Sequence, residues 1–227
     1  IQDLLIKGVQ TKHVDDDTSR RMWWASLEVI QKDFLSQNYQ QGGIWVASPL
    51  PALNDKKFFK KLHGWLWSPE GFPYFKKENA GFLPVNHSAK IKNDLDFISN
   101  YKVLNLSQKD GYEPFLMIIT PNFQCILSIT GEKDKKILLM KCDEESLKIS
   151  IELIHAKLNQ ENYDEGVKFR QSINNLGMLN INNQFEKVFW PTLSAKLAKL
   201  GPNHNIQSYL KNDEQNEQIT EAKLLRA

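Results

Sequence analysis

The sequence predicts an α/β (α+β) fold in which an antiparallel or mixed sheet, containing a three-strand meander, is flanked by helices. Two observations carry this prediction. An amphipathic helix near the N-terminus is followed by a short apolar strand, and three further apolar strands between Phe115 and Cys142 lead directly into a second amphipathic helix. With 41% hydrophobic and 25% charged residues and a net charge of +2, the composition is that of an ordinary globular domain.

The first predicted helix runs from about Ser19 to Gln37. The acidic cluster that begins at Asp15 precedes it and can cap its N-terminus. Its buried face is predicted from apolar residues at spacings of four, three and four, namely Trp23, Leu27, Ile30 and Phe34.

A short buried strand, Ile44 to Ala47, is predicted after the break at Gly42-Gly43 and ends at Ser48-Pro49. From Pro49 to Asn100, Pro, Gly, Asn and aromatic residues alternate without a sustained period. The sequence therefore predicts little there beyond one or two helical turns between Lys56 and Leu62.

The meander consists of three predicted strands, Phe115 to Thr120, Phe123 to Thr130 and Lys136 to Cys142. Turn residues at Pro121-Asn122 and Gly131 to Asp134 separate them. Such short connections favour antiparallel neighbours, so these strands are expected to pair in chain order.

Three helices are predicted after the meander. Asp143 caps the first, whose buried stripe has spacings of four, three and four and consists of Leu147, Ile151, Ile154 and Leu158. His155 lies one residue off this stripe, which predicts a boundary position. The next two helices span Tyr163 to Leu176 and Asn183 to Leu200, and Pro191 is expected to kink the last unless Thr192 begins a new helix.

Composition and motifs disfavour several classes of function. Two cysteines in 227 residues provide no secreted disulfide framework, so a cytoplasmic location is expected. The apolar runs are too short for a membrane span, and the near-neutral charge gives little support for nucleic-acid binding. No nucleotide-binding glycine loop and no metal-ligand spacing of histidines is present, so no cofactor and no metal are predicted.

Cys125 and Cys142 are candidates for a redox-sensing pair. A register in which the numbers of paired residues sum to 267 sets them directly opposite each other on neighbouring strands. A shift of one residue would place them on opposite faces, where they would be two small buried hydrophobic residues.

An aromatic-rich zone is the candidate for ligand binding, since small-molecule pockets are mostly apolar and aromatic. Trp65 and Trp67 are two residues apart, so in an extended segment both point to one face. Core packing beneath an irregular loop is the alternative explanation. The candidate residues are Trp45, Trp65, Trp67, Phe72 and Tyr74.

The chain is predicted to consist of one α/β domain, residues 1–205, and a C-terminal linker helix, residues 206–227. Acidic residues crowd the front of the segment Asn212 to Ala227, as the helix dipole favours. We expect its apolar residues to begin a seam that pairs with a second copy of the chain to form a homodimer; they are Ile219, Ala222, Leu224 and Leu225.

Four segments together resemble the N-terminal input region of cyanobacterial-type sensor histidine kinases: the Trp-rich first helix, Gly43 to Ser48, Trp65 to Pro69, and Glu113 to Phe123. Ile219 to Ala227 resembles the residues that lead into the phosphoacceptor box of those kinases. The box itself and the ATP-binding motifs have no matching positions in this chain, so no catalytic residue is carried over.

The resemblance implies a non-catalytic sensory domain that detects a ligand, a redox state or a protein partner and signals through its last helix to a dimeric kinase. Two alternatives remain open. One is a scaffold or assembly protein of a photosynthetic or other complex, and the other is an enzyme with Cys125 or Cys142 as its nucleophile.

Overall fold

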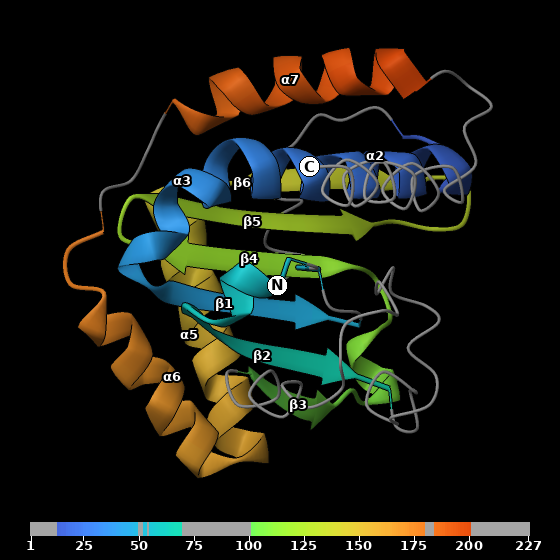
Figure 1. Cartoon of the computed structure of the whole chain (residues 1–227). Coiled ribbons are helices and arrows are strands. Elements are labelled where there is room, and N and C mark those ends of the chain that lie inside the picture. The colour runs from blue at the N-terminus through green and yellow to red at the C-terminus, as the bar shows by residue number, and fades with distance from the viewer. Residues whose placement is uncertain (1–12, 50–51, 54, 70–100, 180–183, 201–227) are drawn as a thin grey trace, which may run out of the picture.

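A mixed six-stranded sheet with helices on both faces forms the protein, as the computed structural model in Figure 1 shows. The structure describes residues 13–49, 52–53, 55–69, 101–179 and 184–200. The strand order is β3-β2-β1-β4-β5-β6. The strands are β1 (Gly43–Ser48), β2 (Leu62–Ser68), β3 (Tyr101–Asn105), β4 (Phe115–Thr120), β5 (Phe123–Thr130) and β6 (Ile137–Lys141). The predicted α+β class is confirmed.

The sheet has a parallel half and an antiparallel half that meet at β1. Strands β1, β2 and β3 are parallel to one another, whereas β4 pairs antiparallel with β1. The predicted meander β4-β5-β6 is confirmed, with antiparallel pairing in chain order. The sequence predicts neither β3 nor β2. Strand β2 is buried at every position except His63 and so shows no alternation.

The N-terminal helix is confirmed, and it begins slightly earlier than expected. Helix α2 (Asp16–Val29) continues through a π-helical segment, Ile30–Leu35, into α3 (Ser36–Asn38). The Asp15 carboxylate accepts a hydrogen bond of 2.7 Å from the backbone N–H of Thr18, which satisfies one of the free donors at the helix start.

The remaining helices also agree with the sequence. They are α4 (Lys56–Phe59), α5 (Glu144–Glu161), α6 (Tyr163–Asn175) and α7 (Phe185–Leu200). The predicted stripe of α5 is buried in full, and His155 is half-buried at its margin. Helix α7 continues through Pro191, and Thr192 Oγ1 donates to the carbonyl oxygen of Val188 on the turn before it.

Two hydrophobic cores lie on opposite faces of the sheet. Helices α2 and α7 cover one face, whose buried residues include Trp45, Ile118 and Cys125. Helices α5 and α6 cover the other face, whose buried residues include Trp65 and Trp67. In Figure 1, α7 is the outermost element on the first face and lies along α2.

Candidate functional site

The aromatic candidates do not gather in one place, because the strand register separates them. Trp45 belongs to the core beneath α2 and α7, whereas Trp65 and Trp67 belong to the core beneath α5 and α6. The prediction that Trp65 and Trp67 share a face is confirmed. The prediction of a single aromatic pocket formed by Trp45, Trp65 and Trp67 is wrong, since the sheet lies between Trp45 and the other two side chains. Phe72 and Tyr74 lie outside the described residues.

Trp45, Gly64 and Tyr101 form a row across the parallel strands. Gly64 pairs with Trp45 on one side and with Tyr101 on the other. The Trp45 indole lies against Gly64, where a Cβ atom would overlap the indole ring. The centroids of the Trp45 and Tyr101 rings are 5.5 Å apart. Burial raises the pKa of the Tyr101 hydroxyl. The row is a packed core feature and leaves the Trp45 ring fully buried.

On the opposite face, Trp65 is held by a carboxylate from α6. Its indole Nε1 donates to Glu165 Oε2 at 3.1 Å, and Lys168 Nζ donates to Glu165 Oε1 at 2.9 Å. Phe169 contacts the Trp65 ring edge to face, with 5.2 Å between the centroids. Glu165 is a buried charge with both of its oxygens engaged, as burial of a carboxylate requires.

Trp67 has a similar arrangement with the end of α5. Its indole Nε1 donates to Glu161 Oε2 at 2.6 Å. Lys157 Nζ lies 2.8 Å from Glu161 Oε1 and 2.9 Å from Asp110 Oδ2. We call the two indoles, their two carboxylates and the two lysines the tryptophan site; its members are Trp65, Trp67, Glu161, Glu165, Lys157 and Lys168.

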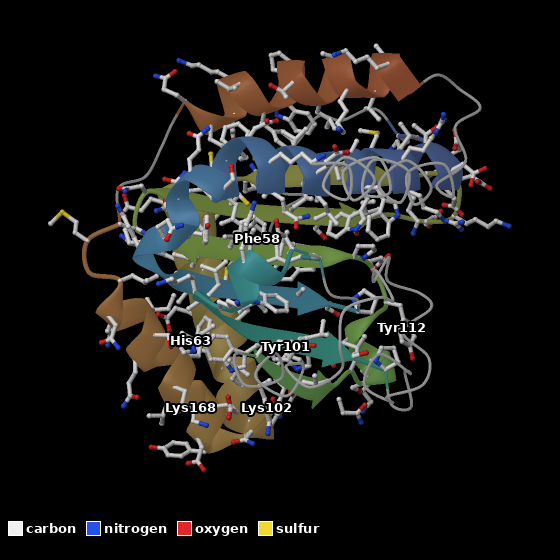
Figure 2. The ribbon with its side chains drawn as sticks, in the orientation of Figure 1. Phe58, His63, Tyr101, Lys102, Tyr112 and Lys168 are labelled. Carbon is white, nitrogen blue, oxygen red and sulfur yellow. The ribbon has the colours of Figure 1, made fainter. Side chains whose placement is uncertain are left out.

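The tryptophan site fastens the junction of α5 and α6 to β2. Each indole donor already has a carboxylate acceptor, and each carboxylate has a lysine, so the polar groups of the site satisfy one another. Lys102 pairs with Trp65 in the register of β2 and β3. Figure 2 shows Lys102 and Lys168 at the same end of the molecule, close to the lower ends of the helices. Neither Glu161 nor Glu165 is a candidate from the sequence, where their only signal is their place at the break between two helices.

The charge of Glu165 is stabilised by its surroundings. Burial acts to raise the pKa of this carboxyl, but the hydrogen bonds from Lys168 and Trp65 and the positive charges of Lys168 and Lys102 outweigh it. The pKa of Glu165 is therefore lowered, and the carboxylate form is the one that the site holds.

A second polar network joins α5 and α6. Arg170 binds both carboxylate oxygens of Glu152, at 2.8 and 2.6 Å, and its Nη2 also lies 3.1 Å from His155 Nδ1. Guanidinium is only a donor, so His155 Nδ1 is the acceptor in this contact, while His155 Nε2 lies 3.1 Å from Asn159 Nδ2. His155 thus occupies the boundary position that was predicted.

The predicted register of β5 and β6 is confirmed, and continuing it by one residue sets Cys142 opposite Cys125. Ile126 pairs with Lys141, so the paired residue numbers sum to 267, and Cys142 immediately follows the last residue of β6. Both thiols are free and buried, and both belong to the core beneath α2 and α7. We call Cys125 and Cys142 the thiol pair.

Cys142 connects the thiol pair to α7. Its Sγ donates to Glu186 Oε1 at a separation of 3.5 Å. Burial, followed by the negative charge of Glu186, raises the pKa of Cys142 to about 12, and burial raises the pKa of Cys125 even further. A cysteine nucleophile requires a lowered thiol pKa, so these surroundings oppose the nucleophile hypothesis.

Three phenylalanines set the position of the start of α7. Phe185 contacts Phe34 of the π-helical segment, with 4.5 Å between the centroids, and Phe123 of β5, with 5.1 Å. Phe34 and Phe123 stack with 5.8 Å between their centroids. At the other end, Lys196 forms an ion pair with Glu28 of α2. Helix α7 therefore rests on β5 and on the N-terminal helix together.

Other sequence predictions fall on parts of the chain that the structure does not describe. Those predicted for the linker helix are Ile219, Ala222, Leu224 and Leu225. Within the described ranges, no three or more His, Cys, Asp or Glu side chains are grouped so that they could hold a metal ion. No helix in those ranges combines the length and the apolar character needed to cross a membrane.

Comparison with known proteins identifies a family but no activity. No curated protein and no solved structure is significantly similar to the chain. A family profile described as a domain of unknown function, DUF8628, matches residues 1–202, which include every described helix and strand. The chain therefore belongs to the DUF8628 family.

Proposed function

We propose that the chain is a non-catalytic sensory domain of a two-component histidine kinase and passes its response to an output domain through residues 206–227. The observation that carries the proposal is the contact between Cys142 Sγ and Glu186 Oε1 at 3.5 Å. It joins a candidate sensing group to α7, the last described element before the linker. The sequence resemblance to kinase input regions supports the same assignment.

A sensor needs two states that the signal stabilises differently, and an element that reports which state is populated. Helix α7 suits that purpose because its first turn touches both β5, through Phe123, and the N-terminal helix, through Phe34. A displacement of the β5-β6 pair would change the surface on which Phe185 rests. The resulting movement of α7 would be passed on to residues 206–227, which follow this helix in the chain.

Among a ligand, a protein partner and a change of redox state, the change of redox state has the most direct support as the signal. A peroxide can oxidise two opposed thiols to a disulfide, with the peroxide reduced to an alcohol and water. The reaction removes the S–H group that donates to Glu186 and leaves a carboxylate acceptor without that partner. Because burial disfavours the reactive thiolate, we expect the pair to respond at the rate of local opening.

The remaining features of the proposal concern the state of the protein in the cell. We propose that it works in the cytoplasm as a homodimer, with no bound cofactor of its own. The dimer would form through the linker helix, where the apolar residues are Ile219, Ala222, Leu224 and Leu225. A small molecule or a protein partner at the tryptophan site is the alternative signal.

The direct test is the sequence encoded after Ala227. We expect it to continue into a helix that carries a phosphoacceptor histidine, and then into an ATP-binding domain. The kinase assay compares autophosphorylation of that longer chain after treatment with dithiothreitol and with diamide. We expect the difference between the two treatments to disappear in Cys142→Ala. A stop codon immediately after Ala227, or a continuation without a kinase, would contradict the proposal.

A scaffold or assembly protein is the second candidate, and the exposed apolar residues of α7 favour it. Val188 is 51% exposed and Trp190 is 37% exposed. Exposed apolar surface of this kind often marks a protein interface. A scaffold predicts a stable complex that the isolated chain forms without any kinase output, which co-purification of the chain from its source would detect.

A further inference from the structure

A histidine lies at the contact between α5 and α6, which run side by side in Figure 1. His155 of α5 is half-buried, and its Nδ1 lies 3.1 Å from Arg170 Nη2 of α6. Its Nε2 lies 3.1 Å from Asn159 Nδ2, one turn further along α5. Arg170 also binds both carboxylate oxygens of Glu152 on α5. We call these four residues, Glu152, His155, Asn159 and Arg170, the helix clasp.

Both ring nitrogens of His155 face a hydrogen-bond donor. A guanidinium group only donates, so Nδ1 is the acceptor toward Arg170. The amide nitrogen of Asn159 is also a donor, and it lies beside Nε2. A neutral imidazole has one acceptor nitrogen, whereas a protonated imidazole has none. The surroundings of His155 therefore suit the neutral ring.

Asn159 and Arg170 differ in how they can respond to a protonated ring. The Asn159 amide can turn about its Cβ–Cγ bond and present its oxygen, which is an acceptor, to Nε2 of His155. Arg170 has no acceptor atom in any orientation. Protonation of His155 at Nδ1 thus removes the acceptor that this ring offers to Arg170, and it adds a positive charge beside the guanidinium.

The other charged groups that face His155 keep their charge at mildly acid pH. Within the part of the chain that the structure describes, they are Glu152 from α5 and Arg170 from α6. Glu165 and Lys168, also on α6, bind each other at the tryptophan site. The hydrogen bond from Arg170 lowers the pKa of Glu152, and the same bond raises the pKa of Arg170. Histidine is the side chain that ordinarily changes its charge between about pH 5 and 8, so His155 is the member of the clasp that changes in that range.

We propose that the helix clasp is a pH-sensitive joint, which is closed while His155 is neutral and opens when this ring takes up a proton. In the open state, the new N–H at Nδ1 finds its acceptor in Glu152, which belongs to the same helix as His155. A contact that spans α5 and α6 is then replaced by a contact inside α5. Glu152 is shared between two cations, so its hold on Arg170 weakens as well.

Opening of the clasp acts on the attachment of α6 to the sheet. Phe169, the neighbour of Arg170, contacts the Trp65 ring, and Glu165 accepts the hydrogen bond from the Trp65 indole. A loosened α6 therefore relaxes the tryptophan site. A fall in pH becomes a signal that the domain registers without a bound ligand or an oxidised thiol, and this holds whether or not a kinase is the output.

NMR of the imidazole nitrogens in the isotope-labelled 227-residue chain tests the state of the ring directly. At about pH 7.5 we expect Nδ1 of His155 to be the unprotonated nitrogen, because Arg170 needs an acceptor there. The spectrum of His155→Gln, which lacks these signals, assigns them. A proton on Nδ1 at that pH in the unaltered chain would overturn the proposal.

Hydrogen exchange tests the opening of the joint. After correction for the intrinsic effect of pH, and relative to peptides from β5, peptides from α6 should exchange at least about threefold faster at about pH 5.5 than at about pH 7.5. His155→Gln keeps an acceptor oxygen and an N–H donor but does not titrate, so this ratio should fall to about one. His63→Gln, which removes an exposed histidine of β2, is the matched control and should keep the full ratio. An equal ratio in the unaltered chain and in His155→Gln would contradict the pH-sensitive joint.

Discussion

Trp65 and Glu165 stand 100 residues apart in the sequence, and the indole Nε1 of Trp65 donates to Glu165 Oε2 at 3.1 Å. This bond crosses from the middle of the parallel half of the sheet to the first turn of α6. Because both groups are buried, removing the acceptor leaves an indole N–H that water cannot reach easily. The pair is thus a sensitive point for the attachment of α6.

Substitution of Glu165 separates the hydrogen bond from the charge. Glu165→Leu removes both, and we expect it to lower the free energy of unfolding by about 1–3 kcal/mol because the Trp65 N–H loses its acceptor. Glu165→Gln keeps an acceptor oxygen, so its loss should be smaller. Urea denaturation measures both values. Equal losses in the two variants would contradict the importance of the indole bond.

The lowered pKa of Glu165 predicts that acid reduces the stability of the folded protein. The pKa of Glu165 is lowered in the folded protein, so the folded state binds its proton less readily than the unfolded state does. The stability that the charge contributes is present above the ordinary glutamate pKa and is lost as the pH falls through the lower folded value. We expect the unfolding free energy of Glu165→Gln to decline less steeply below about pH 4.5 than that of the unaltered chain, as urea denaturation across this range would show.

Gly64 predicts a steric effect on the other face of the sheet. A Cβ atom at this position overlaps the Trp45 indole, so Gly64→Ala should destabilise the protein by about 1–3 kcal/mol, measured by urea denaturation. Combining Gly64→Ala with Trp45→Phe, which replaces the indole by a smaller ring, should recover part of the lost unfolding free energy. A double variant whose loss equals the sum of the two single losses would show that the indole and the added methyl group do not interact.

The regular parts of this fold could be predicted from the sequence because their periodicity is local. The stripe of α5 from Leu147 to Leu158 and the meander from Phe115 to Cys142 can be recognised within a few turns or strands, and both are confirmed. The thiol register could be predicted for the same reason, since the hairpin turn at Gly131 lies between the two cysteines. Strand β3 could not, because a short edge strand is defined by its distant partner β2.

The prediction of a single aromatic site failed for a physical reason that the sequence does not display. Trp45 and Trp65 look alike in composition, but Trp65 pairs with Val46, the neighbour of Trp45, and neighbouring residues of a strand point to opposite faces. The carboxylates of the tryptophan site were equally hidden. Glu161 and Glu165 become partners of the two indoles only through the packing of α5 and α6 against β2.

The thiol pair predicts slow chemistry in the folded protein. Burial, with the negative charge of Glu186 next to it, raises the pKa of Cys142 to about 12, and only the thiolate attacks an alkylating reagent. At pH 8 we therefore expect iodoacetamide to modify Cys142 at least ~100-fold more slowly in the native protein than in urea. Mass spectrometry of timed samples measures both rates, with Cys125 followed in the same digest.

Glu186→Gln provides the matched control, because it removes the charge and keeps a group of the same shape. The pKa of Cys142 should then be raised less, and its native alkylation should become faster while that of the fully buried Cys125 stays slow. If the substitution freed α7 instead, both cysteines would react faster together. Native alkylation of Cys142 as fast as in urea would show that the thiol is already open to solvent, and the coupling to Glu186 would then have no basis.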